Sequence, residues 1–453
     1  MHRIRHQILE LELPREAGAL ALQRRASRVF QEQVLPRLDE AFSRIAPADR
    51  IVRIERLELD LGDLSEANWE REFVEKCVAQ IEQQVAEAAF MVGGEFTSET
   101  ISPEENALSI FLYFLETGTL PWHAKHLTLK MLEESVHTAM VRGAAFQGQA
   151  FYRILKENAG ALQRLVWQFS REFSKKIVES ALGTTEGWVE QAIQIRQSQT
   201  GQKMSIQAFV VLSRQLFIAE GSVLRSTLPT PGLLAQLFFE ENPVAAKSPT
   251  ANTGSEAALQ TAAPKPAASS EPDRLKTTQT QADPVGVAVD SAGLVLLAAY
   301  LSPFFKKLGL DLTNNPAELE DEPHFRAVHL LHYLATGQEH PEEPLLVLPK
   351  ILCGMDIETP VPQLLDLSDE EKIEANKLLE AIIRNWPELK STSPDGLRAG
   401  FLRRTGLLSW EVNRQAWLLR IERLGQDLLL DKVPWSYSVI KLPWMEKMVQ
   451  VEW

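Results

Sequence analysis

The sequence has few of the features that cross-link a protein, anchor it in a membrane or direct its export. Its 453 residues include two cysteines, Cys77 and Cys353, which could form at most one disulfide. A reduced, intracellular setting is therefore the expectation. The longest apolar run, Ala292 to Leu301, is about half of the ~20 residues that a membrane-spanning helix needs. The first residues lack the apolar block and cleavage site of a signal peptide. We expect no transmembrane helix and no export by that route.

Motifs for enzyme chemistry are also missing. The sequence has no GxxxxGK[ST] phosphate loop, no Rossmann glycine fingerprint and no GxSxG nucleophile elbow. Its acidic runs, such as Glu104-Glu105 and the run from Glu318 to Glu322, are typical of helix starts and solvated faces. We therefore predict no catalytic residue, no cofactor and no enzyme activity.

Four histidines form the one cluster of side chains that could bind a metal. His329 and His332 are three residues apart on a predicted helix, so they share a face that a zinc site could use, and His324 and His340 flank them. No Cys, Asp or Glu stands at a spacing that completes a known ligand set. An ordinary helix face is the simpler interpretation, so we predict no metal site. A metal-dependent enzyme is the remotest function considered.

The charge balance argues against a nucleic-acid partner. Acidic residues outnumber basic ones, 61 to 47, which gives a net charge of -14. Phosphate binding needs clustered Lys and Arg, and the chain as a whole does not offer them. With 45% hydrophobic residues, however, the chain can build real cores, and its length suits two to four domains. The sequence predicts a globular α+β protein that is mainly α-helical.

Residues 1–92 are predicted to form a β-α-β-α unit. Ile4 to Leu13 is strand-like, and apolar residues then recur at helical spacing from Leu22 to Phe42, with Pro36 expected to kink or divide the helix. Ile51 to Leu61 alternates as a strand, and the stripe from Trp69 to Val85 predicts a second helix. Two strands make a poor sheet, so we expect further strands from elsewhere in the chain or from a partner.

Residues 93–241 are predicted to be helical and to contain one half of a possible repeat. The segment ALSIFLYFLETGTLPW, residues 107–122, reads as an apolar helix that ends at Gly118. RAVHLLHYLATG, residues 326–337, has the same pattern, so that FLYFLETG matches LLHYLATG at an offset of 219. Duplication and coincidence both remain open, because an apolar helix that ends in Thr-Gly is common.

Composition changes sharply at residues 242–290, which are rich in Ala, Pro, Ser and Thr and cannot assemble a core. We predict a flexible linker there. A second helical region follows over residues 291–396. It opens with GLVLLAAYLSPFFKKLGL, an apolar helix that we expect to be interrupted at Pro303, and includes a helix from Asp369 to Ile383.

The last part of the chain, residues 397–453, is predicted to be a small β-rich module dense in tryptophan. Period-two alternation indicates strands over 417–421, 437–442 and 449–453. Six of the ten tryptophans are found from Trp386 onward, which is more than a short module can easily bury.

These tryptophans have two interpretations. The simpler is that they fill the core of their own module. The other is that some of them, with the terminal strand, bind a partner, because an exposed strand edge recruits another strand. The candidate partner-binding residues are Pro434, Trp435, Ile440, Leu442, Pro443, Trp444, Val449, Val451 and Trp453.

Several segments together resemble the tape measure proteins of contractile injection systems, the phage-tail-like particles that bacteria build. The resemblance covers both ends and the middle of the chain and leaves out the linker and much of residues 127–239. The matching segments are IERLELDLG (54–62), FLETGTLPW (114–122), 293–310, 333–337, WPELKSTSPDGLR (386–398), FLRRTG (401–406) and LLLDKVPWSYSVIKLPWMEKMVQVEW (428–453).

The resemblance implies a structural component that is made in the cytoplasm, assembles with inner-tube and baseplate or spike proteins in one or several copies, and sets tube length inside the particle. A single helix of 453 residues would be ~680 Å long, but 25 prolines and the globular patterns forbid one. A length-measuring chain must therefore unfold or act in several copies. The alternative function is a soluble helical chaperone or adaptor that loads cargo or tube subunits and then leaves.

Overall fold

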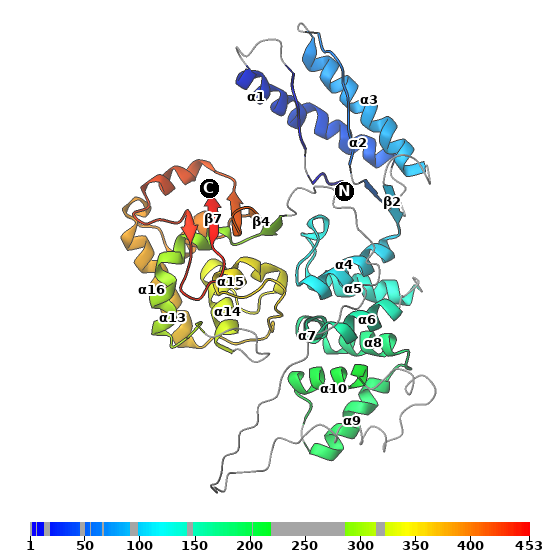
Figure 1. Cartoon of the computed structure of the whole chain (residues 1–453), viewed down its shortest axis with the longest axis vertical. Coiled ribbons are helices and arrows are strands. Elements are labelled where there is room, and N and C mark those ends of the chain that lie inside the picture. The colour runs from blue at the N-terminus through cyan, green and yellow to red at the C-terminus, as the bar shows by residue number, and fades with distance from the viewer. Residues whose placement is uncertain are drawn as a thin grey trace, which may run out of the picture.

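The structure is a computed structural model that describes residues 2–5, 7–12, 19–45, 50–54, 56–65, 68–90, 98–142, 148–201, 203–218, 286–313 and 322–453. It is mainly α-helical with small sheets, which confirms the predicted fold class. Figure 1 shows an elongated N-terminal unit at the top, a stack of helices beneath it, and a rounded C-terminal part beside the stack. Within the described ranges, every helix is too short or too polar to cross a membrane.

The N-terminal unit is built on two long helices that lie side by side (Figure 1). The first runs through α1 (Ala19–Val29), the π-helical turn η1 (Phe30–Val34) and α2 (Leu35–Ile45). The Leu35 N–H bonds to the Phe30 carbonyl, five residues back, just before Pro36, which has no N–H to donate. Pro36 thus interrupts the α-helical pattern without ending the helix. The second helix is α3 (Trp69–Phe90), and its predicted stripe is buried at Phe73, Cys77, Ile81 and Val85.

The strands of this unit differ from the prediction. β1 (Ile51–Ile54) is shorter than expected and pairs antiparallel with β2 (Ser98–Ile101), which sequence reasoning missed. Residues 56–65 continue without ladder bonds, because side chains of α3 bond to several of their carbonyls instead. The predicted strand Ile4 to Leu13 forms no ladder with another strand over residues 4–5 and 7–12 either. A strand needs a neighbour to complete its hydrogen bonds, and among the described residues neither segment has one.

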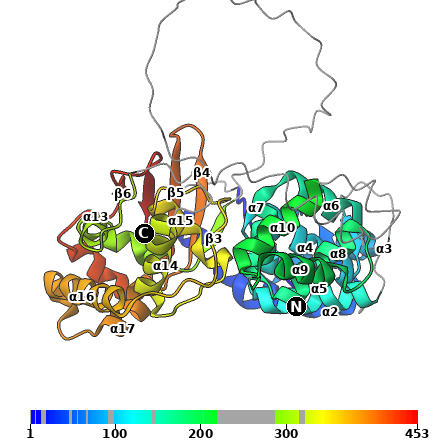
Figure 2. The ribbon, with the colours of Figure 1, turned by 90° about the horizontal axis from the view of Figure 1, so that it is seen from below.

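The helical stack carries its own core and lies within the predicted helical region, of which residues 219–241 fall outside the described residues. Phe111 lies at its centre, with the rings of Phe151, Phe169 and Phe173 all within 6 Å of its ring centroid. The elements of the stack are α4 (Pro103–Thr117), η2 (Trp122–Ala124), α5 (Leu129–Val141), α6 (Gly148–Glu157), α7 (Ala159–Gln168), α8 (Arg171–Leu182), α9 (Trp188–Thr200) and α10 (Ile206–Ile218). Figures 1 and 2 both place α7 on the side of the stack that faces the C-terminal part.

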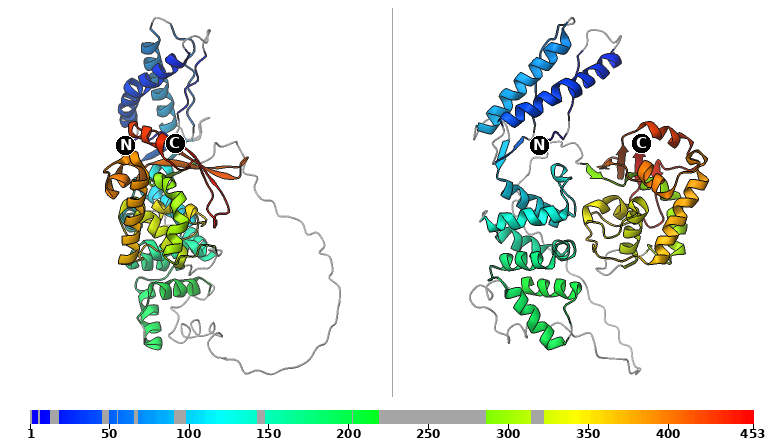
Figure 3. Two further views of the ribbon diagram at one scale, coloured as in Figure 1. Left: turned by 90° about the vertical axis from the view of Figure 1, so that its left-hand side faces the viewer. Right: turned by 180° about the vertical axis from the view of Figure 1, so that it is seen from behind.

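The C-terminal part, residues 286–453, has one continuous core, so the predicted helical region 291–396 and β-rich module 397–453 pack as one body. It combines helices with a sheet near the chain end, and the right-hand view in Figure 3 shows this part beside the stack. Its helical elements are η3 (Ala292–Leu297), α13 (Ala298–Lys307), α14 (Glu322–Thr336), η4 (Glu343–Leu346), α15 (Val347–Leu352), α16 (Asp369–Asn385), η5 (Pro387–Leu389), α17 (Pro394–Leu397), η6 (Arg398–Leu402) and η7 (Gly425–Lys432).

Pro303 does not interrupt its helix, contrary to expectation. It lies inside α13, and the change of geometry occurs earlier, where 3-10 helix η3 passes into α13 at Leu297 and Ala298. Pro303, in the middle of α13, removes one backbone bond, and the buried side chains Leu301, Phe304 and Phe305 offset that loss by packing.

The sheet of the C-terminal part has five strands in the order β3-β4-β5-β7-β6. β5 pairs with β7 in parallel, and the other neighbours are antiparallel. Two of its strands, β3 and β4, were not predicted. β3 lies at the end of the predicted linker, of which only residues 286–290 are among the described residues. The strands are β3 (Val287–Val289), β4 (Gly406–Glu411), β5 (Ala416–Ile421), β6 (Val439–Ile440) and β7 (Val449–Glu452).

The two segments of the possible repeat end in the same way. Helix α4 ends at Gly118 with φ +72°, and α14 ends at Gly337 with φ +74°. In each case an arginine from a distant helix donates to a carbonyl of the last turn: Arg164 to Leu115, and Arg398 to Leu334. The two accepting leucines are themselves 219 residues apart, so the sequence match extends to shared capping contacts.

Candidate assembly site: a buried junction between the stack and the C-terminal part

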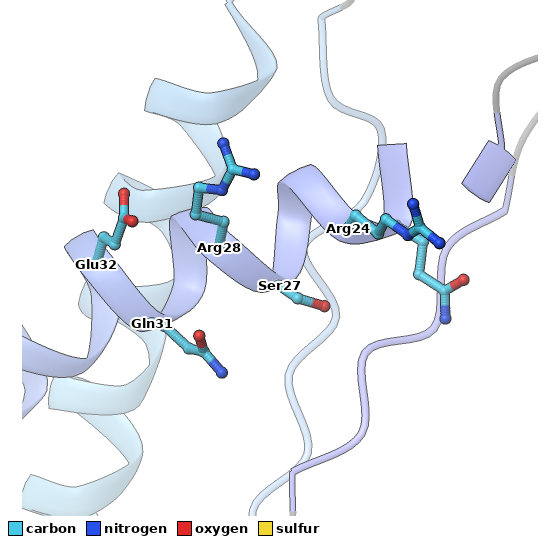
Figure 4. Close-up of a pocket in the computed structure, with 6 residues that line it drawn as sticks. Arg24, Ser27, Arg28, Gln31 and Glu32 are labelled. Atoms are coloured by element: carbon cyan, nitrogen blue, oxygen red, sulfur yellow. The ribbon is translucent and has the colours of Figure 1, made fainter. Parts of the chain in front are cut away.

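A shallow pocket on the first long helix offers little to a small molecule. It is a hollow of about 550 Å³ lined by Gln23, Arg24, Ser27, Arg28, Gln31 and Glu32. Figure 4 shows these side chains along a single helix, α1 with the start of η1. A ligand there would have no opposing wall, whereas ligand sites are normally concave and bury most of the ligand.

The most elaborate polar site is a junction that joins the helical stack to the C-terminal part. Arg164 of α7 is 1% exposed, and Glu343 of η4 is fully buried. The Nε of Arg164 lies 3.0 Å from Oε1 of Glu343. Arg164 also donates to the carbonyls of Leu115 and Glu116 at the end of α4 and to the carbonyl of Glu358. One side chain thereby ties together α7, α4 and two segments of the C-terminal part.

A second buried cation completes the charge arrangement. Nζ of Lys350, which is 1% exposed, lies 2.6 Å from Oε1 of Glu343 and donates to the carbonyl of Ile357 at 2.9 Å. Burial lowers the pKa of Lys350, while Glu343 opposes that shift. Charges so far from water are stable only when they are paired and hydrogen-bonded, so the loss of Glu343 would leave two cations uncompensated.

Hydrogen bonds of the Gln168 amide and of the Glu342 carboxylate extend the junction. The Glu343 N–H donates to Oε1 of Gln168 at 3.0 Å, and Nε2 of Gln168 donates to the Val361 carbonyl at 2.8 Å. The carboxylate of Glu342 accepts a bond from the Leu129 N–H at the start of α5, and burial raises the pKa of Glu342. We define the junction as Arg164, Gln168, Glu342, Glu343 and Lys350.

Local sequence explains why these side chains meet. A capping box formed by Ser102 and Glu105 starts α4, and Gly118 ends it in the left-handed conformation. The chain turns away at Gly118 and leaves the carbonyls of the last turn open to Arg164. A side chain at Gly118 would collide with the junction, because its Cβ would lie 2.5 Å from Oε1 of Glu343 and 2.9 Å from Nε of Arg164.

Sequence reasoning missed all five junction residues, although two of them carried a signal. Lys350 is the lone charge in the apolar run LLVLPKILCG, and Arg164 interrupts the apolar pattern of ALQRLVWQF. A charge on a helix face that packing requires to be apolar indicates a buried partner. The partner itself could not be found from the sequence, since Arg164 and Glu343 are separated by 179 positions.

Three of the four candidate histidines, His324, His329 and His332, are buried and His340 is half-buried, but they are not brought together as a ligand set. Nε2 of His329 lies 2.9 Å from the Pro362 carbonyl, and Nδ1 of His332 has no hydrogen-bond partner in the described structure. Burial lowers the pKa of each of these two imidazoles to about 4. Among the described residues, no three His, Cys, Asp or Glu side chains are grouped so that they could hold a metal ion.

The predicted partner-binding residues lie in and around the core of the C-terminal part. Contrary to the prediction of an exposed strand edge, the terminal strand β7 lies between β5 and β6. Ile440, Leu442 and Val449 are buried, Pro434 and Pro443 are exposed, and the other four are half-buried. The indole N–H groups of Trp435 and Trp444 donate to the carbonyls of Leu296 and Leu352. Partner binding by the exposed portions of this set stays a prediction.

A second buried ion pair holds the chain end. Arg404, from the FLRRTG segment, makes two bonds to the carboxylate of Asp427, at 2.7 and 2.8 Å. The indole N–H of Trp453 donates to the same carboxylate at 3.0 Å, and the Arg404 guanidinium lies over the Trp453 ring. Burial acts to raise the pKa of Asp427, but the bonds from Arg404, the Leu424 N–H and Trp453 outweigh it, so the pKa is lowered.

The fold and its junctions define a protein of several packed parts. The profile of the contractile injection system tape measure protein family matches residues 1–453, the whole chain. The protein therefore belongs to the contractile injection system tape measure proteins. No curated protein matches it, and no solved structure does either.

Proposed function

We propose that this protein is a structural and assembly component that contacts the inner tube and the baseplate or spike of a contractile injection particle and helps to set tube length. The observation that carries the proposal is the family match, which includes both chain ends. The proposal includes synthesis in the cytoplasm of the producing bacterium and one or several copies in each particle. No catalytic step is assigned to it.

The fold constrains how such a chain could measure length. The longest helix in the described residues, the one that runs through α1, η1 and α2, covers residues 19–45 and therefore spans ~40 Å. The junction also holds the stack and the C-terminal part together, so the folded chain is far shorter than a single helix of its length. If the junction opens during assembly, residues 242–285 of the predicted linker could separate the two parts by up to ~150 Å. Opening of the junction, or the use of several copies, is the physical requirement of the proposed ruler role.

The test is the composition and tube length of purified particles. Particles assembled with the full chain should contain it, and removing roughly 30 residues from 242–285, ~100 Å of extended chain, should shorten the tubes measured by electron microscopy. Unchanged tube length with normal incorporation would contradict length setting but keep the structural role. Absence of the protein from complete particles, together with dependence of particle yield on it, would support the alternative of a chaperone or adaptor that leaves before completion.

A further inference from the structure

The segment between α15 and α16 has no helix or strand of its own and lies along one face of α7. We call residues 354–368 the strap. Arg164 and Gln168 are four residues apart on α7, so they share that face. Arg164 donates to the strap carbonyl of Glu358, and Nε2 of Gln168 donates to that of Val361 at 2.8 Å. Two side chains of the stack thus hold the backbone of the C-terminal part directly.

The strap also packs closely on α7. Gly160 lies one turn before Arg164, and a Cβ at Gly160 would be 3.2 Å from Cγ of Pro360. Val361, next to Pro360, is fully buried. Release of the strap would therefore expose Val361, uncover this face of α7 and weaken the junction.

A histidine holds the strap from its other side. Nε2 of His329, on α14, lies 2.9 Å from the carbonyl oxygen of Pro362. A carbonyl oxygen only accepts hydrogen bonds, so Nε2 carries the hydrogen and donates it. The carbonyl one residue earlier, that of Val361, is the one that Gln168 binds. Consecutive strap carbonyls are therefore bound from the stack and from α14, and His329 is the titratable member of this clamp.

The surroundings of α14 disfavour a second proton on His329. Burial lowers the pKa of His329 to about 4, the charges of His340 and Arg326 act in the same direction, and the bond to Pro362 opposes them. Each carboxylate of the described groups around α14 already has a basic partner, and η3, which packs there too, is wholly apolar. The charged and titratable side chains around α14 include His324, His332, Arg326 with Glu371, Glu339 with Lys372, His340 with Asp366, Glu343 with Lys350, and Arg398 with Asp395.

We propose that the strap is an acid-sensitive latch: protonation of His329 releases the strap from α14 and from the face of α7, and so loosens the attachment of the helical stack to the C-terminal part. The neutral imidazole keeps the strap closed above about pH 6.5, where a histidine in water is also neutral. As the pH falls from there towards 4, the open form gains stability because its imidazole can take up a proton in water.

The size of the effect follows from the two pKa values. With a pKa of about 4 when closed and about 6.5 when open, the ratio of open to closed molecules should rise about tenfold between pH 7.5 and pH 5.5. This behaviour does not depend on the proposed role in tube length, and its tests use the isolated full chain.

The first test measures how often the strap opens. Val361→Cys, which changes the side-chain volume little, places a thiol in the buried middle of the strap. Its labelling by dithiodipyridine, a reagent that also reacts with thiols in acid, is followed by mass spectrometry and divided by the rate for free cysteine at the same pH. This ratio should rise about tenfold from pH 7.5 to pH 5.5. Cys77, 2% exposed in the core of the N-terminal unit, is the internal control and should stay protected. Equal acceleration at Cys77 would mean general unfolding and would overturn the latch.

Replacing the titrating group should remove the effect. In the Val361→Cys chain, His329→Gln supplies an amide N–H that can still donate to the Pro362 carbonyl but takes up no proton in this range. The rise in labelling should then be less than about twofold. His126→Gln, at an exposed site in the stack, is the matched control and should keep the wild-type rise. A rise that survives His329→Gln would contradict the proposal.

The second test needs no change in the strap. The full chain, cut after folding at a protease site placed within residues 242–285, is studied by analytical ultracentrifugation at both pH values. The two fragments should bind each other about tenfold less tightly at pH 5.5 than at pH 7.5, and His329→Gln should abolish that difference. A dissociation constant that is the same at both pH values for the chain with His329 would overturn the latch.

Discussion

Arg164 and Glu343 form a fully buried ion pair, with Nε and Oε1 3.0 Å apart, between two parts of the chain separated by 179 positions. The pair also fixes the end of α4, since Arg164 caps its last carbonyls. A single contact therefore serves both the helical stack and its attachment to the C-terminal part. The energetic cost of breaking it should exceed that of a surface ion pair.

Replacing Glu343 tests the cost of breaking the junction. Glu343→Gln keeps the shape but leaves Arg164 and Lys350 without a buried anion, so we expect a loss of about 3–5 kcal/mol in the free energy of unfolding. Chemical denaturation measures it. Glu452→Gln removes the partner of Arg420 in an exposed pair and should leave the denaturation midpoint near wild type. Equal effects of the two variants would show that the junction is not buried in solution.

Gly118 provides a test of shape at the same site. Gly118→Ala and Gly183→Ala both place a Cβ at a left-handed helix end, which costs about 1 kcal/mol. Nothing lies within 4 Å of the added atom at Gly183, whereas at Gly118 it meets Glu343 and Arg164. We expect Gly118→Ala to cost at least about 2 kcal/mol more than its control, measured by thermal melts. Similar melting temperatures for both would mean that the junction has room to move.

The buried histidines predict a specific pH dependence. Because the folded pKa of His332 is about 4 against an ordinary 6.5, its contribution is complete above pH 6.5 and is lost as the pH falls towards 4. The loss amounts to at most about 3 kcal/mol. His332→Leu, which removes an imidazole with an unpartnered Nδ1, should flatten the fall in melting temperature over this range. His137→Leu, at an exposed site, should retain the wild-type slope.

The terminal strand should be essential to its own part of the molecule. Deletion of residues 450–453 removes most of β7 from between β5 and β6, along with the Trp453 bond to Asp427. We expect the C-terminal part to unfold at a markedly lower temperature while the helical stack, which has its own core, still melts cooperatively. Leu428→Ala, at a side chain 72% exposed, is the control. An unchanged melting curve for the truncated chain would contradict this structural role and would instead support partner binding by the terminal strand.

Local patterns in the sequence predicted much of the fold. The stripe of α3, the end of α4 at Gly118, and strands β5 and β7 follow from apolar periodicity and from a glycine that tolerates positive φ. These features depend on neighbours in sequence. β3, β4 and the junction depend on segments brought together from far along the chain, which no local pattern contains.

Among the motifs behind the family resemblance, only the closing segment was considered as a partner surface, beside the simpler interpretation as core, and the structure shows several of these motifs packed on each other. Trp435 of the closing segment bonds to Leu296 of the 293–310 segment, and FLRRTG supplies Arg404 to Asp427. A tryptophan at a partner surface and one in a core have the same residue type and spacing. Only the burial and the hydrogen-bond partner of a tryptophan distinguish these two cases, and both are properties of the folded chain.

Cleavage between the two joined parts tests the central claim most directly. A specific protease site placed within residues 242–285 allows the full chain to be cut after folding, and size-exclusion chromatography at micromolar concentration then reports whether the fragments remain together. Because the junction buries two cations around Glu343, the fragments should elute as one complex of the original mass, and Glu343→Arg should release them. Two separate peaks from the cleaved wild-type chain would contradict the account.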